Sequence, residues 1–207
     1  KTNNEDYKTS FIEDSAYMTA EINQLIISQK IKKLCLIDIS TGNGNFLDFV
    51  TKKINLDHIA VGFDINKNII QNNKQRDELK HIKFKYGRVQ EHDNYVSNLS
   101  RDNSICFFSR KSLTFYSNKE INELLALLNE VKTKAYFFLI ETNNFNYRKK
   151  NETNYRDAPN FYAHNYPLIF KKNNWELMWS KKKYINIFIN DHWIYCGFTT
   201  KNEGRVT

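Results

Sequence analysis

Five short apolar runs recur along the chain and alternate with longer polar stretches. The runs are Leu34–Ile39, His58–Phe63, His81–Tyr86, Ser104–Ser109 and Ala135–Ile140. Continuous apolar runs of this length are typical of strands buried on both faces of a parallel sheet. Helical spacing fits three of the intervening segments, at Asn45–Lys53, Asn66–Glu78 and Lys119–Lys132. Strand alternating with helix predicts an α/β fold with a mostly parallel sheet.

The two ends of the chain differ from this pattern. Segments 176–189 and 192–200 are consecutive strand-like runs around Asn190 and Asp191, which predicts an antiparallel hairpin at one sheet edge. Ser15–Lys30 predicts an amphipathic helix, and the dozen residues at the beginning are expected to be polar and mobile. We expect one domain, with a helical cap over 1–30, a core over 31–207 and a substrate-side insertion over 142–174.

The formal net charge of +8 comes from 31 basic and 23 acidic residues that are spread along the chain. Such a charge attracts phosphates and acidic ligands, but basic residues that are not clustered favour ordinary surface charge over a nucleic-acid face. The basic run Asn146–Arg156 is interpreted as a surface loop, with a phosphate contact as the less favoured alternative.

Other features favour a soluble cytoplasmic protein. Cys35, Cys106 and Cys196 each lie in an apolar run without a CxxC pair, which predicts reduced core residues. No apolar run approaches the roughly 18 residues of a membrane-spanning helix, and no leader segment is recognised. Glu91–Asp93 is interpreted as a solvated loop, and no metal site is expected.

The segment IDISTGNGNF, residues 37–46, carries the most specific chemical signal. Gly42 and Gly44 allow a tight turn from strand to helix, so that the backbone can approach a ligand closely. Asp38 precedes this turn, and Asp64 ends the next predicted strand, where a carboxylate can accept both hydroxyls of a ribose. A dinucleotide-binding motif GxGxxG fits less well, because Leu47 occupies its third glycine position.

The arrangement resembles the class I S-adenosylmethionine-dependent methyltransferases. Besides IDISTGNGNF, the similarity includes VGFDIN (61–66), SRKSLTFY (109–116) and FFLIET (137–142), and the closing hairpin is similar to that family's reversed last strand. The resemblance implies a three-layer αβα sandwich with a mostly parallel seven-stranded sheet, and S-adenosylmethionine as the cofactor. It implies cofactor contacts from Asp38, Ser40, Gly42, Gly44, Asp64, Ile65, Val89, Gln90 and Ser109.

Two positions depart from the family's pattern. Ser40 replaces the first glycine of its motif, and Arg88 occupies the place where the family usually has an acid near the adenine. Adenine contacts are therefore expected from backbone groups or from Val89 and Gln90.

The methyl acceptor is inferred by elimination. The motifs of enzymes that methylate amines or the cytosine ring of DNA are absent after the fourth strand, which favours a small-molecule acceptor. RNA or a protein side chain stays an alternative, as does a cofactor-binding subunit without activity. His164, with Tyr162 beside it, is the candidate for orienting or deprotonating the acceptor, although a purely structural histidine is at least as plausible.

Overall fold

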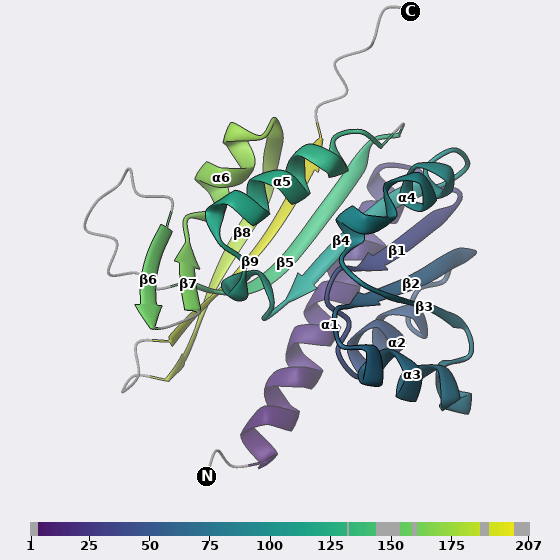
Figure 1. The fold of residues 1–207 in the computed structure, drawn as a ribbon, viewed down its shortest axis with the longest axis horizontal. Coiled ribbons are helices and arrows are strands. Elements are labelled where there is room, and N and C mark those ends of the chain that lie inside the picture. Colours follow the sequence, from purple (N-terminus) through teal and green to yellow (C-terminus); the bar gives the residue numbers. More distant parts are fainter. Residues whose placement is uncertain (1–3, 132, 144–153, 159–160, 187–190, 201–207) are drawn as a thin grey trace, which may run out of the picture.

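A seven-stranded sheet forms the centre of the protein (Figure 1). The computed structural model describes residues 4–131, 133–143, 154–158, 161–186 and 191–200. The sheet contains β1 (Leu34–Asp38), β2 (His58–Asp64), β3 (Ile82–Tyr86), β4 (Ser104–Arg110), β5 (Ala135–Asn143), β8 (Trp175–Asn186) and β9 (Asp191–Thr200). Their order is β3-β2-β1-β4-β5-β9-β8. Strands β1 to β5 pair in parallel, whereas β9 is antiparallel to both of its neighbours.

Helices cover both faces of this sheet. They are α1 (Asn4–Ser28), α2 (Asn45–Thr51), α3 (Lys67–Gln75), α4 (Asp93–Leu99), α5 (Asn118–Leu128) and α6 (Tyr166–Lys172). Three short 3-10 helices are η1 (Asp77–Leu79), η2 (Val89–His92) and η3 (Leu113–Phe115). Strands β6 (Asn154–Ala158) and β7 (Phe161–His164) pair separately, and β7 contacts η3 beyond the end of β4.

Alternation along the buried strands separates two apolar cores. In β1, Cys35 and Ile37 belong to a core shared with α4, α5 and α6, while Leu34 and Leu36 belong to a core shared with α1, α2 and α3. Successive side chains of a strand point to opposite faces, so a strand apolar at every position supplies both cores. The result is the predicted three-layer αβα sandwich with an antiparallel C-terminal strand pair.

Several local predictions need correction. The N-terminal helix begins at Asn4, so the expectation of a mobile first dozen residues is wrong for most of that segment. Glu91–Asp93 is helical rather than a loop, because it lies in η2 and at the beginning of α4, although Glu91 and Asp93 are exposed as expected. The predicted helix over 66–78 ends earlier, at Gln75, because Arg76 adopts an extended conformation. Residues 146–153 of the basic run and Asn190 of the predicted turn lie outside the described residues.

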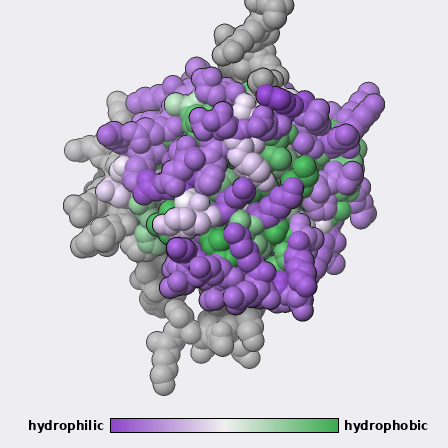
Figure 2. Space-filling view, turned by 45° about the vertical axis from the view of Figure 1, so that its right-hand side comes forward, coloured by the Kyte–Doolittle hydropathy of each residue, from purple (hydrophilic) through white to green (hydrophobic). Residues whose placement is uncertain are grey.

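The face in Figure 2 is mostly hydrophilic, with smaller hydrophobic areas between the charged side chains. Among the described residues, no helix is long and apolar enough to cross a membrane. The three cysteines are free thiols buried in the core, as predicted, and burial raises the pKa of Cys35 to about 12.

Candidate functional site

The loop between β1 and α2 folds over the carboxyl end of β2. The Thr41 amide donates a hydrogen bond to the carbonyl of Phe63 at 2.7 Å. The Gly42 amide donates to Asp64 Oδ2 at 2.9 Å, and the Asn66 amide donates to Asp64 Oδ1 at 2.8 Å. Each carboxylate oxygen of Asp64 keeps a further lone pair, and the side chain is half-buried. Asp64 can therefore accept hydroxyl groups from a bound molecule while it holds the loop.

The two glycines of this loop are each needed for a different structural reason. Gly42 (φ +52°) and Gly44 (φ +77°) adopt left-handed backbone conformations that other residues rarely adopt. A Cβ atom on Gly44 would lie 3.0 Å from the Phe84 ring, whereas nothing lies within 4 Å of the corresponding position on Gly42. Gly44 therefore packs the loop against the sheet, and Gly42 leaves open space beside the backbone.

Asp38 is a carboxyl group with almost no exposure to solvent, at 3%. Burial is the main cause that raises its pKa from the ordinary 3.8 to about 7, and the negative charge of Asp64 raises it further. The Ser40 amide, which donates to Asp38 Oδ1 at 3.1 Å, and the nearby Arg110 act in the opposite direction. A cation bound near Asp38 would favour the ionised carboxylate.

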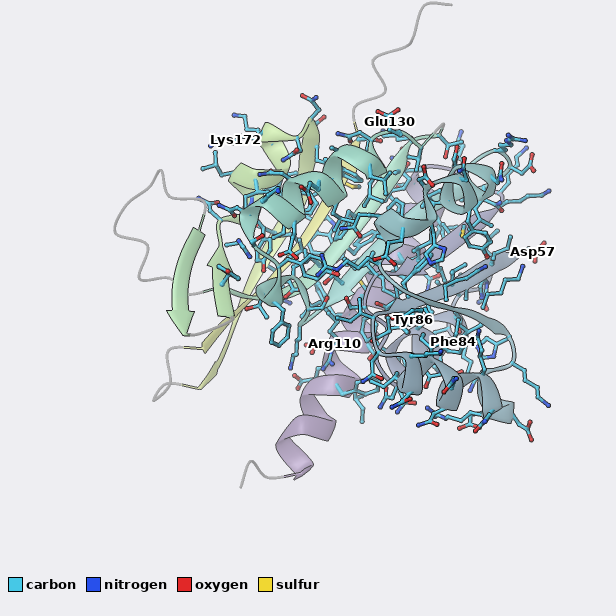
Figure 3. All side chains as sticks on the ribbon, in the orientation of Figure 1. Asp57, Phe84, Tyr86, Arg110, Glu130 and Lys172 are labelled. Atoms are coloured by element: carbon cyan, nitrogen blue, oxygen red, sulfur yellow. The ribbon has the colours of Figure 1, made fainter. Side chains whose placement is uncertain are left out.

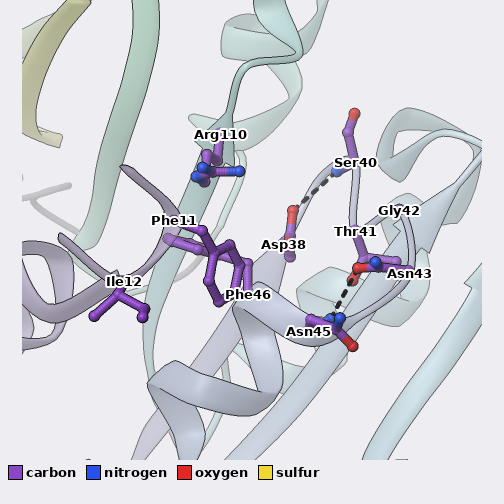
Figure 4. Close-up of a pocket in the computed structure, with 10 residues that line it drawn as sticks. All are labelled: Phe11, Ile12, Asp38, Ser40, Thr41, Gly42, Asn43, Asn45, Phe46 and Arg110. Atoms are coloured by element: carbon purple, nitrogen blue, oxygen red, sulfur yellow. Dashed lines mark hydrogen bonds between the residues drawn. The ribbon is translucent and has the colours of Figure 1, made fainter. Parts of the chain in front are cut away.

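A cavity of about 610 Å³ lies next to this loop (Figure 4). The β1–α2 segment contributes Asp38, Ser40, Thr41, Gly42, Asn43, Asn45 and Phe46 to its wall. Phe11 and Ile12 come from α1, and Arg110 comes from the end of β4. Figure 3 shows Arg110 and Tyr86 at the edge of the sheet where β4 and β3 end. Glu130 and Lys172 lie toward the opposite edge. Ligands of open α/β sheets bind at this carboxyl edge.

The predicted adenine side lies after β2 and β3. Ile65 is 63% exposed beside Asp64, which makes it an open apolar surface. Val89 is buried, and Gln90 has a buried Oε1 atom without a hydrogen-bond partner in the described structure. Arg88 forms a 2.8 Å ion pair with Glu120 of α5. Arg88, which stands where the family usually has an acid, is therefore paired with a carboxylate of α5.

Ser109 lies deeper than the resemblance implies. Its side chain is fully buried, and its hydroxyl donates to Glu141 Oε1 at 2.5 Å. The same oxygen accepts the amides of Ser112 and Leu113, both at 3.0 Å. Burial raises the pKa of Glu141. Ser109 and Glu141 thus fix the turn after β4, and this geometry does not favour a direct cofactor contact by Ser109.

His164 and Tyr162 do not line the cavity. His164 is fully buried, with Nε2 2.8 Å from the Tyr116 carbonyl and Nδ1 3.1 Å from Asn118 Oδ1. The Tyr162 ring stacks on His164 at a centroid distance of 5.7 Å, and its carbonyl accepts the Thr114 hydroxyl. Because both ring nitrogens of His164 have partners within the protein, this geometry favours the structural alternative over the predicted base.

The part of the cavity wall outside the β1–α2 segment was not predicted from the sequence; it consists of Phe11, Ile12 and Arg110. Phe11 and Ile12 lie in the segment that was expected to be mobile. Arg110 carried a signal, because a charged residue directly follows a buried strand at the edge where ligands bind.

No protein-family model matches the sequence, and no curated protein sequence matches it. Among solved structures, the fold is similar to that of 1,6-didemethyltoxoflavin-N1-methyltransferase from Burkholderia thailandensis, with bound 1,6-didemethyltoxoflavin and S-adenosylhomocysteine. The TM-score is 0.64 at 10% identity, over 95% of this chain and 86% of that one. Geranyl diphosphate C-methyltransferase from Streptomyces coelicolor A3(2), in complex with S-adenosyl-L-homocysteine, gives a TM-score of 0.60 at 9% identity, over 81% and 69%.

LepI, in complex with S-adenosylmethionine, gives a TM-score of 0.60 at 12% identity, over 82% of this chain but only 43% of LepI. Identities this low establish the fold and not the activity. The strand order, the reversed β9 and these similarities agree with one another. The chain therefore has the fold of the class I S-adenosylmethionine-dependent methyltransferases.

Proposed function

We propose that this protein binds S-adenosylmethionine at the carboxyl ends of β1 and β2 and transfers its methyl group to a small molecule. The products would be an O- or N-methylated acceptor and S-adenosylhomocysteine. The observation that carries the proposal is Asp64, which is held by the amides of Gly42 and Asn66 and remains half-buried at the end of β2. The solved structures with this fold that contain the cofactor or its product support the same assignment.

The described residues fit the parts of this cofactor. Asp64 would accept the ribose hydroxyls, and Ile65 offers an apolar surface for the adenine. The buried Gln90 Oε1 atom, which lacks a partner in the described structure, would accept the adenine amino group. Asp38 would lie near the cationic end of the cofactor. The open space beside Gly42 would allow close approach to the backbone.

The bound cofactor supplies a methyl group on a cationic sulfur. The contribution of the protein is to align the acceptor with the sulfur–methyl bond and to exclude water. The residues of the cavity would hold the acceptor with its attacking atom toward that methyl group, and the proton that the acceptor gives up would leave to solvent. We place the acceptor in the cavity lined by Phe11, Phe46 and Arg110, with α1 as the cap over it.

A small-molecule acceptor is favoured because the wall of this cavity is partly aromatic and lies under α1. Two of the solved structures with this fold are named as methyltransferases of 1,6-didemethyltoxoflavin and geranyl diphosphate, which supports the same class of acceptor.

Calorimetric titration with S-adenosylhomocysteine tests the cofactor site. We expect Asp64→Ala to weaken binding by about 1–3 kcal/mol, since buried hydroxyls would lose a charged acceptor. Asp57→Ala is the matched control, because Asp57 is exposed and precedes the opposite end of the same strand (Figure 3). Equal affinity of the two variants would remove Asp64 from the site, and binding without turnover across a broad acceptor panel would favour an inactive subunit.

A further inference from the structure

Arg110 is a largely buried cation in the wall of the cavity. Its side chain is 10% exposed, and it follows directly after the buried part of β4. The guanidinium lies 5.3 Å from the centre of the Phe11 ring and 5.7 Å from that of the Phe46 ring. Burying a charge is costly unless it is paired, so a buried arginine beside an open cavity requires an explanation.

Asp14 of α1 pairs with only part of the Arg110 guanidinium. Arg110 Nε donates to Asp14 Oδ2 at 3.1 Å, and Nη2 lies 2.9 Å from the same oxygen. The direction of the second contact is not that of a hydrogen bond, and Nη2 is buried without another partner in the described structure. A guanidinium has five N–H donors in a planar fork that matches the two oxygens of a carboxylate. Asp14 occupies one side of this fork and positions the rest.

The cavity also contains a carboxyl group that can carry the opposite charge. Asp38 lines the same wall as Arg110, and the two are close enough for the guanidinium to favour the ionised form of the carboxyl (Figure 4). Asp38 can attract an ammonium group, while the free side of Arg110 can attract an anion. The two aromatic rings beside Arg110 reduce its access to water, which strengthens its attraction for a carboxylate.

We propose that Arg110, positioned by Asp14 of α1, binds a carboxylate that enters the cavity. This inference rests on the proposed function for the source of that carboxylate. One source is the amino-acid end of the cofactor, and the other is a carboxylate on the acceptor. In both cases Arg110 determines specificity at a position where the sequence similarity implies no role.

Calorimetric titration of Arg110→Gln with two adenosyl thioethers distinguishes the sources. S-adenosylhomocysteine carries the amino-acid end, and 5′-methylthioadenosine lacks it. If the cofactor is the source, Arg110→Gln binds S-adenosylhomocysteine about 10- to 100-fold more weakly than the wild type, while 5′-methylthioadenosine binds equally to both. If the acceptor is the source, benzoate binds to the wild type saturated with S-adenosylhomocysteine and fails to bind to Arg110→Gln.

Two further variants control this test. Arg101→Gln removes one exposed positive charge that precedes β4, at the opposite end of that strand from Arg110, and should change none of these affinities. Removing Arg110 alone leaves Asp14 buried without its cation, which can unfold the chain. The double variant Asp14→Asn/Arg110→Gln removes both charges at similar volume, and it should show the same selective loss.

Two results would overturn the inference. One is an unchanged affinity for all three compounds in Arg110→Gln and in the double variant. The other is an equal loss for both thioethers, because a change in the cavity's shape would not depend on the carboxylate. If the wild type binds neither thioether, the proposed function fails, and benzoate alone then decides whether Arg110 binds carboxylates.

Discussion

Asp38 should make the protein less stable as the pH rises through the neutral range. The structure raises the pKa of this carboxyl from 3.8 to about 7, mainly through burial. Between these two values the unfolded chain has lost the proton that the folded chain keeps, so the free energy of unfolding falls as the pH rises. Each pH unit corresponds to about 1.4 kcal/mol, and a range of about three units gives a total near 4 kcal/mol.

Replacement of Asp38 by asparagine isolates this contribution. The amide keeps an oxygen for the Ser40 N–H group but does not ionise. We expect Asp38→Asn to gain stability relative to the wild type by about 1.4 kcal/mol per unit between pH 4 and pH 7, and to gain no more above that range. Other titrating groups are common to both proteins, so their effects cancel in the difference.

Urea unfolding of both proteins at about pH 4.5, 6 and 8 measures this difference in the free energy of unfolding. Asp102→Asn serves as the control, because Asp102 is exposed and its substitution removes a carboxyl group without changing the buried site. A difference between wild type and Asp38→Asn that does not change with pH would refute the argument that burial holds this carboxyl protonated.

Three further predictions concern stability and activity. Gly44→Ala should lower the free energy of unfolding by about 1–3 kcal/mol in urea titrations, because the added methyl group would lie 3.0 Å from the Phe84 ring at a left-handed φ; an unchanged midpoint would contradict this packing. His164→Gln should lower the melting temperature and leave turnover per folded molecule intact, since both ring nitrogens have partners within the protein; a loss of turnover by about 10²-fold or more would restore the base role. Phe170→Ala should cost about 3–5 kcal/mol in the same urea titrations, because the Phe170 ring is fully buried and stacks on Phe198 at 3.9 Å; a cost below about 1 kcal/mol would show that this core relaxes around the cavity.

The sheet could be predicted because its strands are locally distinct in the sequence. Strands such as β1, which is apolar at every position before Asp38, have a pattern that is rare outside a sheet covered on both faces. Helix α4 was missed because it has only seven residues, of which Val96 is the buried one. A helix this short obtains its stability from tertiary contacts rather than from its own sequence.

Some residues of the candidate site could likewise be predicted from the sequence, and others could not. The placement of Asp38, Gly42 and Asp64 could be predicted because β1 and β2 are neighbouring parallel strands, whose carboxyl ends lie at the same edge of the sheet. The pairing of Asp14 with Arg110 spans 96 positions and depends on how α1 packs against the sheet. No local pattern contains that information. The role predicted for His164 lost support for a similar reason, since its burial comes from the contact of β7 with η3.

A crystal structure of the protein with S-adenosylhomocysteine tests the central claim most directly. We expect density for the nucleoside at the carboxyl ends of β1 and β2. Both ribose hydroxyls should lie within hydrogen-bonding distance of Asp64, and the adenine should lie against Ile65. Density for the compound elsewhere, or an empty site at saturating concentration with Asp64 bonded only to Gly42 and Asn66, would contradict the account.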